Sequence, residues 1–200
     1  ILSQRHGRLG VITLNRAPAL NALSLGMVRE LTRCLRAWEV DDHVDAVLVH
    51  GATRPGKAPA FCAGGDIRFF HQAALAGDPQ LEDFFTEEYA LNHLIHAYPK
   101  PYIAFLDGIV MGGGMGIAGH ARPAWTPGQT AGSLRLVTPN TRMAMPETNI
   151  GLFPDVGGGH FLSRCPGHVG EYLALTGDVV GGADAVASAP SSSRVRPGRR

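Results

Sequence analysis

The fold of this chain is decided by residues 102–116, which read YIAFLDGIVMGGGMG. The apolar segment Tyr102 to Leu106 predicts a buried strand, and the triple glycine at 112–114 predicts the start of a helix. The N-terminus of a helix presents free backbone N–H groups and the positive end of the helix dipole. The stretch therefore predicts a strand and a helix whose junction can hold an anion or a developing oxyanion.

Strands and helices alternate along the rest of the chain. Residues 9–14 and 45–50 are short, apolar and rich in β-branched side chains, which is typical of buried strands. Ser24 can cap a helix that runs to about Val40, and apolar side chains recur at helical spacing over 81–98. This alternation predicts an α/β fold.

A second glycine cluster follows another predicted strand. Gly64 and Gly65 stand directly before Asp66 in the segment AFCAGGDI, residues 60–67. Either cluster alone is typical of a tight turn. Two clusters, each after a strand, favour a pair of backbone donors for an oxyanion.

Two carboxylates stand in an otherwise apolar and glycine-rich segment, Glu147 and Asp155 within PETNIGLFPDVGGG at 146–159. Glu147 can cap a turn, and Asp155 can cap a helix that begins at Gly157. Alternatively, the two carboxylates share an apolar pocket that drives their pKa values apart and gives acid and base roles at neutral pH. The spacing alone leaves both interpretations open.

Other kinds of site fit the sequence less well. The glycines at 114, 116 and 119 match a dinucleotide-binding turn, but no acidic residue lies between Asp107 and Glu147 to hold a ribose hydroxyl. No glycine–lysine pair is followed by serine or threonine, which excludes a P-loop.

Two further side-chain groups are interpreted as structural. His93 and His96 lie one helical turn apart, but no third ligand is placed by the sequence, so no metal is predicted. Cys62, close to Gly64, is expected to be a small packed residue because no partner base is indicated.

Composition excludes several classes of protein. With 44% hydrophobic residues the chain is not wholly disordered, and no stretch approaches the roughly 18 uncharged apolar residues of a membrane span. The formal net charge of +1 comes from four arginines in residues 185–200, so no nucleic-acid surface is expected on the rest of the chain. Three cysteines without a C-x-x-C pair favour a reduced, intracellular setting.

Motifs at three places follow the order found in a known family. They are GVITLNR with LNAL at 10–23, AFCAGGDI at 60–67 and GIVMGGGMG at 108–116. In these motifs, and from about Gly7 to Asp184, the chain resembles the crotonase (enoyl-CoA hydratase/isomerase) superfamily. The resemblance implies a spiral of ββα units and an acyl-CoA substrate.

Within that superfamily, EEY at 87–89 and AMPETNIGLFPDVGGG at 144–159 resemble the branch that hydrolyses 3-hydroxyisobutyryl-CoA in valine breakdown. Hydratases carry two catalytic glutamates. One of them falls at Glu147, but the other would fall at Gly116, and Asp155 stands where hydratases have glycine. The resemblance therefore implies hydrolysis of a short hydroxyacyl-CoA thioester.

The resemblance also implies roles for single residues. These are backbone oxyanion donors at Gly65 and Gly113, a catalytic base or nucleophile at Glu147, assistance with proton transfer or hydroxyl orientation by Asp155, a pocket-lining Glu88, and Arg68 near the coenzyme A phosphates. No cofactor is implied, because coenzyme A is part of the substrate.

The chain also departs from the family pattern. Residues 122–134 are interpreted as an insertion within an acyl-CoA domain of residues 1–186, and residues 187–200 as a disordered tail rich in Ser, Pro and Arg. The helices that follow in family members are expected to be missing here. Two rival functions stay open: an enoyl-CoA hydratase or isomerase, and a non-catalytic remnant that binds coenzyme A.

The expected partner is the acyl-CoA, with no nucleic acid and no membrane, and a homo-oligomer is possible on family grounds. No targeting segment is visible in the chain. The resemblance implies a cytoplasmic enzyme, or one of the mitochondrial matrix if the source is eukaryotic.

Overall fold

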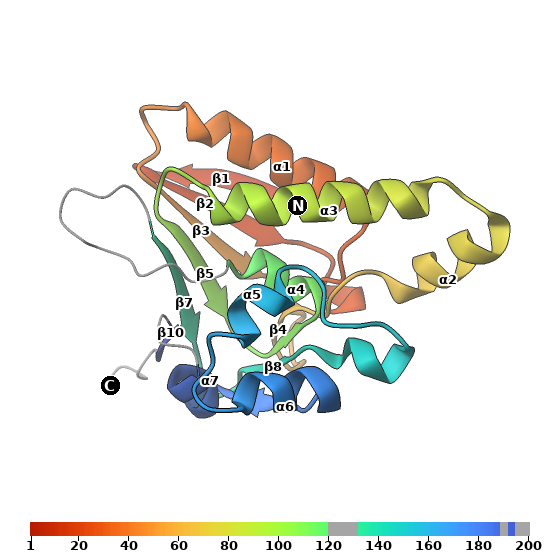
Figure 1. The fold of residues 1–200 in the computed structure, drawn as a ribbon. Coiled ribbons are helices and arrows are strands. Elements are labelled where there is room, and N and C mark those ends of the chain that lie inside the picture. The colour runs from red at the N-terminus through yellow and green to blue at the C-terminus, as the bar shows by residue number, and fades with distance from the viewer. Residues whose placement is uncertain (120–131, 189–191, 195–200) are drawn as a thin grey trace.

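Strands of two β-sheets alternate along the chain with the helices that cover them (Figure 1). The computed structural model describes residues 1–119, 132–188 and 192–194. The strands are β1 Leu2–His6, β2 Leu9–Leu14, β3 Ala46–Gly51, β4 Ala60–Cys62, β5 Tyr102–Leu106, β6 Ile109–Met111, β7 Ser133–Val137, β8 Arg142–Ala144, β9 Val180–Gly181 and β10 Ser192–Arg194. The α-helices are α1 Leu25–Glu39, α2 Ile67–Ala76, α3 Gln80–His96, α4 Gly113–Ile117, α5 Gly158–Leu162, α6 Val169–Thr176 and α7 Gly182–Ser188, and the 3₁₀ helices are η1 Ala17–Ala19 and η2 Pro146–Ile150.

Successive strand pairs divide between the two sheets. The larger sheet has the order β1-β2-β3-β5-β7-β10, and the smaller has the order β4-β6-β8-β9. In the pairs β3/β4, β5/β6 and β7/β8, the first strand joins the larger sheet and the second joins the smaller one. The expected spiral of ββα units is confirmed. Because β4, β6 and β8 run parallel, their carboxyl ends meet at one edge of the smaller sheet.

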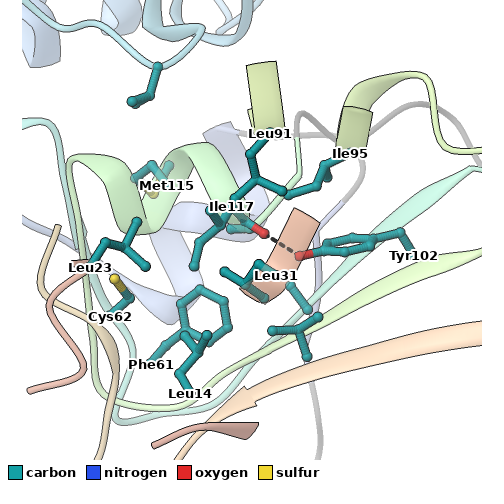
Figure 2. Packing of buried hydrophobic residues seen from close by; sticks show 14 of the residues in the cluster. Leu14, Leu23, Leu31, Phe61, Cys62, Leu91, Ile95, Tyr102, Met115 and Ile117 are labelled. Atoms are coloured by element: carbon teal, nitrogen blue, oxygen red, sulfur yellow. Dashed lines mark hydrogen bonds between the residues drawn. The ribbon is translucent and has the colours of Figure 1, made fainter. Parts of the chain in front are cut away.

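Helices α1 and α3 lie side by side across the larger sheet (Figure 1). Leu31 of α1 and Leu91 of α3 are buried in the core between the helices and the sheets (Figure 2). Complete burial of one such side chain contributes about 1.5–3 kcal/mol. The Tyr102 hydroxyl donates a 2.6 Å hydrogen bond to the Ile117 carbonyl, which ties α4 to β5 (Figure 2).

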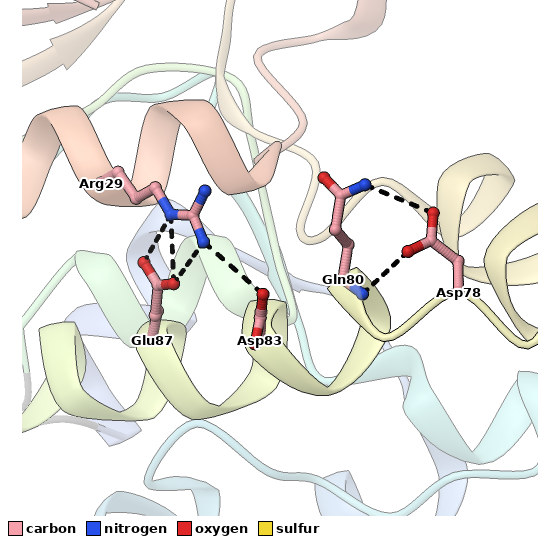
Figure 3. Close-up of polar contacts among 5 residues, drawn as sticks. All are labelled: Arg29, Asp78, Gln80, Asp83 and Glu87. Carbon is pink, nitrogen blue, oxygen red and sulfur yellow. Dashed lines mark hydrogen bonds and ion pairs between the residues drawn. The ribbon is translucent and has the colours of Figure 1, made fainter.

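An ion pair joins α3 to α1 on the outside of the helices (Figure 3). The Arg29 guanidinium donates to both carboxylate oxygens of Glu87, at 2.7–3.1 Å, and lies 3.7 Å from an Asp83 oxygen. Adjacent residues of a helix point about 100° apart. With Glu87 turned toward α1, the next residue, Glu88, faces the interior.

Several predicted elements are confirmed by the structure. Strands β2 and β5 have the bounds expected from the sequence, residues 9–14 and 102–106. Helix α1 begins after Ser24, whose Oγ accepts a hydrogen bond from the Met27 amide.

Two boundaries differ from the prediction. Ser133 and Leu134 were assigned to the insertion 122–134, but they begin β7 and pair with β5; residues 122–131 lie outside the described residues. In the segment 187–200, the first two residues belong to α7, and residues 192–194 form β10 parallel to β7. Strand pairing uses backbone groups, so it does not require the apolar pattern that this segment lacks.

No helix in the described part of the chain combines the length and apolar character needed to cross a bilayer.

Candidate active site

Two glycine turns meet at the carboxyl ends of β4 and β6. A Cβ added to Gly113 would lie 3.4 Å from the Gly65 amide nitrogen, and one added to Gly64 would lie 3.6 Å from the Gly113 nitrogen. Gly64 and Gly112 have φ values of +98° and +47°, which favour glycine over other residues. Within the described residues, neither the Gly65 nor the Gly113 N–H donates a hydrogen bond. Two free donors therefore converge, as an oxyanion hole requires.

Glu147 lies beside this corner, in the 3₁₀ turn that follows β8. Its Oε1 is 2.6 Å from the point that a Cβ on Gly112 would occupy. The residue is 7% exposed, and its Oε2 has no hydrogen-bond partner among the described residues. Burial, with a smaller contribution from Asp155, raises the Glu147 pKa to about 7. A carboxyl group with that pKa is suited to act as a base near neutral pH.

Asp155 belongs to the loop between η2 and α5 and is held by a side chain from α3. The Tyr89 hydroxyl donates a 2.7 Å hydrogen bond to Asp155 Oδ2. The residue at the N-cap of α5 is Gly157, and no side chain caps that helix. The Asp155 carboxylate is therefore not a helix cap but a group oriented toward the site.

Glu88 points from α3 into the same region and is 2% exposed. Burial raises its pKa to about 8, and the nearby Asp155 and Glu147 carboxylates contribute in the same direction. The two glutamates of the EEY motif therefore have different surroundings. Glu87 forms an ion pair with Arg29 near the surface, whereas Glu88 is buried.

These groups line one cavity of about 220 Å³. Its walls include the glycine turns, Phe70, Phe85, the carboxyl side chains of Glu88, Glu147 and Asp155, and the apolar residues Ile150 and Leu152. The structure thus brings together Gly65, Gly113, Glu88, Glu147 and Asp155, residues that lie up to 90 positions apart. The cavity combines amide donors with carboxyl groups of raised pKa, which is suited to acyl transfer with proton transfer.

The sequence of the chain matches a family model over most of its length. Residues 9–195 match the family described as enoyl-CoA hydratase/isomerase. The chain belongs to this family.

Relatives and solved structures agree with this membership. The chain is 52% identical over 183 residues to a 3-hydroxyisobutyryl-CoA hydrolase, mitochondrial, of Xenopus tropicalis, covering 92% of this chain and 44% of the relative. The corresponding Gallus gallus protein is 43% identical, covering 100% of this chain and 48% of the relative. The chain spans about half the length of the curated relatives it matches.

Among solved structures, an enoyl-CoA hydratase from Rhodobacter sphaeroides superposes with a TM-score of 0.85 at 41% identity, covering 98% of this chain and 54% of that one. A carnitinyl-CoA dehydratase from Mycobacterium thermoresistibile gives 0.81 at 46% identity, covering 94% and 51%. Both support the spiral ββα fold of the enoyl-CoA hydratase/isomerase family.

The second glutamate of hydratases has no room at Gly116. A Cβ there would lie 2.7 Å from both Asn92 Oδ1 and the Cβ of Val156. Real Cβ atoms essentially never approach other atoms so closely. Asn92 and Val156 therefore fill the space next to Gly116, the position at which the resemblance places the second glutamate of hydratases.

Arg68 lies outside the catalytic cavity. It is an exposed residue of α2 and lines a neighbouring groove of about 590 Å³ together with Arg16, Asp66 and Gln72. The Arg16 guanidinium forms a 2.6 Å ion pair with Asp66. The groove shares Ala63, Gly65 and Ile67 with the cavity of about 220 Å³, so the two adjoin.

The remaining candidates take no part in the cavity. Burial raises the Cys62 pKa to about 12, so this thiol is not a nucleophile near neutral pH. Cys62 instead packs beneath α4, where a Cβ on Gly114 would lie 2.5 Å from its carbonyl oxygen. In the described ranges, no three His, Cys, Asp or Glu side chains lie close enough to hold a metal, His93 and His96 included.

Sequence reasoning missed Tyr89 as a site residue. It was considered only as part of the EEY motif at 87–89, because nothing local reveals a partner 66 residues away. The EEY motif was the available signal, since it places a phenol directly after the buried Glu88.

Proposed function

We propose that the protein hydrolyses a short hydroxyacyl-CoA thioester, with 3-hydroxyisobutyryl-CoA as the substrate. The observation that carries the proposal is the position of Glu147 beside two free amide donors, with Asp155 held across the same cavity by Tyr89. The names of the relatives, hydrolases of 3-hydroxyisobutyryl-CoA, support this choice of substrate. Residues 1–186 would form the acyl-CoA domain.

The chemistry follows from the placement of these groups. The thioester oxygen would accept hydrogen bonds from the Gly65 and Gly113 amides, which stabilise the negative charge that develops there; one such donor typically contributes about 10²–10³ in turnover. Glu147 would act as base or nucleophile at the carbonyl carbon. In the net reaction, water adds its oxygen to that carbon, the C–S bond breaks, and the acid and the free thiol of coenzyme A are released.

Asp155 would select the hydroxyacyl group. Its Oδ2 is occupied by the Tyr89 hydroxyl, which leaves its other oxygen to accept a hydrogen bond from a substrate hydroxyl or to pass on a proton. A cavity of about 220 Å³ suits a short branched acyl chain rather than a long one. No cofactor enters this scheme.

Addition of water to an alkene is less well supported. That reaction needs a second carboxylate, and the crowding around Gly116 excludes one there without rearrangement. Arg68, in the groove that adjoins the cavity, would lie near the coenzyme A phosphates. Because the relatives are named as mitochondrial, we propose the mitochondrial matrix as the location if the source is eukaryotic.

The test compares two substrates on the purified protein. Release of free thiol from 3-hydroxyisobutyryl-CoA, without hydration of crotonyl-CoA, supports the proposal. Hydration of crotonyl-CoA would instead support a hydratase. Binding of coenzyme A with neither reaction would support a non-catalytic remnant.

A further inference from the structure

The Glu88 side chain ends against the backbone of Gly113, one of the two proposed oxyanion donors. The point that a Cβ on Gly113 would occupy is 2.3 Å from Glu88 Oε1 and 3.4 Å from the Gly65 nitrogen, and it lies two bonds from the Gly113 nitrogen itself. That point is one bond from the Gly113 Cα, so Glu88 Oε1 closely approaches the Gly113 backbone, and Glu88 lines the same cavity as both donors. Oε1 has no hydrogen-bond partner among the described residues, and burial keeps solvent from supplying one.

We propose that Glu88 is a catalytic residue whose protonated carboxyl group donates a third hydrogen bond to the thioester oxygen. The proposal rests on the proposed thioesterase function and adds a donor to its oxyanion hole. The reason is electrostatic. An ionised carboxylate at this point would oppose the negative charge that develops on the substrate oxygen, whereas a neutral carboxyl group would stabilise it.

The surroundings favour the neutral form. The titratable groups that face Glu88 come from several elements: Glu147 of η2, Asp155 of the following loop, the Tyr89 hydroxyl and the Cys62 thiol of β4. None of these is a cation. Burial together with the two carboxylates raises the Glu88 pKa to about 8, so the group keeps its proton at neutral pH.

A neutral carboxylic acid is an established kind of donor in oxyanion holes that exclude water. Glu88 also leaves the base role to Glu147, whose Oε1 lies beside Gly112 at the same corner of the cavity. Two buried carboxyl groups can therefore divide donor and base functions between them.

Two substitutions test whether Glu88 acts as a hydrogen-bond donor or as an ionised carboxylate. Glu88→Gln keeps the shape and an N–H donor, and Glu88→Leu keeps a similar volume without any donor. We expect Glu88→Leu to lower kcat by about 10²–10³ with little change in KM, and Glu88→Gln to lower it by no more than about tenfold. In the wild type, kcat should fall as the pH rises above about 8, and in Glu88→Gln this alkaline fall should disappear.

A binding measurement keeps the inference testable without turnover. An acyl-CoA analogue with a methylene group in place of sulfur cannot be hydrolysed, and a ¹³C label makes its carbonyl stretch visible by difference infrared spectroscopy. The bound stretch should lie at lower frequency in the wild type and in Glu88→Gln than in Glu88→Leu, even if no thioester is hydrolysed. An absent thioesterase activity would thus overturn the proposed function without deciding on Glu88.

The contrary outcomes are equally specific. Equal carbonyl frequencies in all three proteins would show that Glu88 does not touch the oxygen. A Glu88→Gln variant as slow as Glu88→Leu would show that an ionised carboxylate is required. If Glu88→Leu fails to unfold cooperatively on heating, the pH profile of Glu88→Gln against the wild type decides the question.

Discussion

The Tyr89 hydroxyl donates a 2.7 Å hydrogen bond to Asp155 Oδ2, which links helix α3 to the loop before α5. The hydrogen bond holds Asp155, a lining residue of the cavity, against helix α3. We expect Tyr89→Phe to lower kcat for 3-hydroxyisobutyryl-CoA by about tenfold, because a hydrogen bond to a charged group contributes about 1.5–3 kcal/mol. Tyr172→Phe is the matched control, since its hydroxyl bonds to Asp178, which does not line the cavity. Equal kcat values for the two variants would contradict a positioning role.

Replacement of Glu147 by glutamine preserves volume and removes the ionisable group. We expect Glu147→Gln to lower kcat by about 10²–10⁴, the range for a positioned proton-transfer group, while the affinity for coenzyme A is retained. Steady-state thiol release and calorimetric binding of coenzyme A measure the two quantities. The exposed Glu82→Gln serves as the control. A Glu147→Gln variant with more than half of the wild-type turnover would exclude Glu147 as base or nucleophile.

Replacement of Gly116 by glutamate should destabilise the fold rather than create a hydratase. The new side chain would clash with Asn92 and Val156, and overpacking of this kind costs about 1–3 kcal/mol. We expect a lower melting temperature and no hydration of crotonyl-CoA. Gly159→Glu is the control, because no atom lies within 4 Å of a Cβ at that position. A stable, hydrating Gly116→Glu variant would disprove the argument from crowding.

The buried carboxyl groups should make stability depend on pH. The pKa values of Glu88 and Glu147 are raised in the folded chain, to about 8 and about 7, from an ordinary value of 4.5. The folded state therefore binds these protons more tightly than the unfolded state. The stability that they contribute is complete below about pH 4.5 and is lost as the pH rises through 7 to 8.

Thermal unfolding at two pH values isolates this effect. The melting temperature of Glu88→Gln relative to the wild type should be higher at pH 8.5 than at pH 5, because glutamine has no proton to lose. Groups common to both proteins cancel in this comparison. A difference in melting temperature that does not change with pH would mean that Glu88 titrates alike in the folded and unfolded chains.

Arg68 should affect binding but not chemistry. Its groove adjoins the catalytic cavity without containing Glu147. We expect Arg68→Ala to raise KM severalfold with kcat unchanged, and the effect should shrink as salt screens the charge. Arg54→Ala, exposed in the loop between β3 and β4, is the control. A change in kcat without a change in KM would place Arg68 in another role.

Local sequence patterns predicted much of the fold. The apolar runs at 9–14 and 102–106 became β2 and β5 with the expected bounds, because burial on both faces leaves a continuous signal. The strand at 192–194 could not be predicted, since its pairing depends on the exposed edge of β7 rather than on its own side chains.

The site was predictable only in part. Glycines after strands and the carboxylates of the PETNIGLFPD segment are local features, and the resemblance supplied their roles. The burial of Glu88 and the partner of Asp155 depend on how α3 is rotated about its axis, which its packing against α1 and the core determines. Spacing along one segment does not contain that information.

Each turn of the spiral delivers one functional group to the same edge of the smaller sheet: Gly65 after β4, Gly113 after β6 and Glu147 just beyond β8. Under the proposed function, the groups that take part in the reaction thus come from separate, consecutive ββα units. An altered residue after one strand would change the chemistry on the bound thioester while the other units still bind its carbonyl group. Such an architecture allows new chemistry to be acquired one loop at a time.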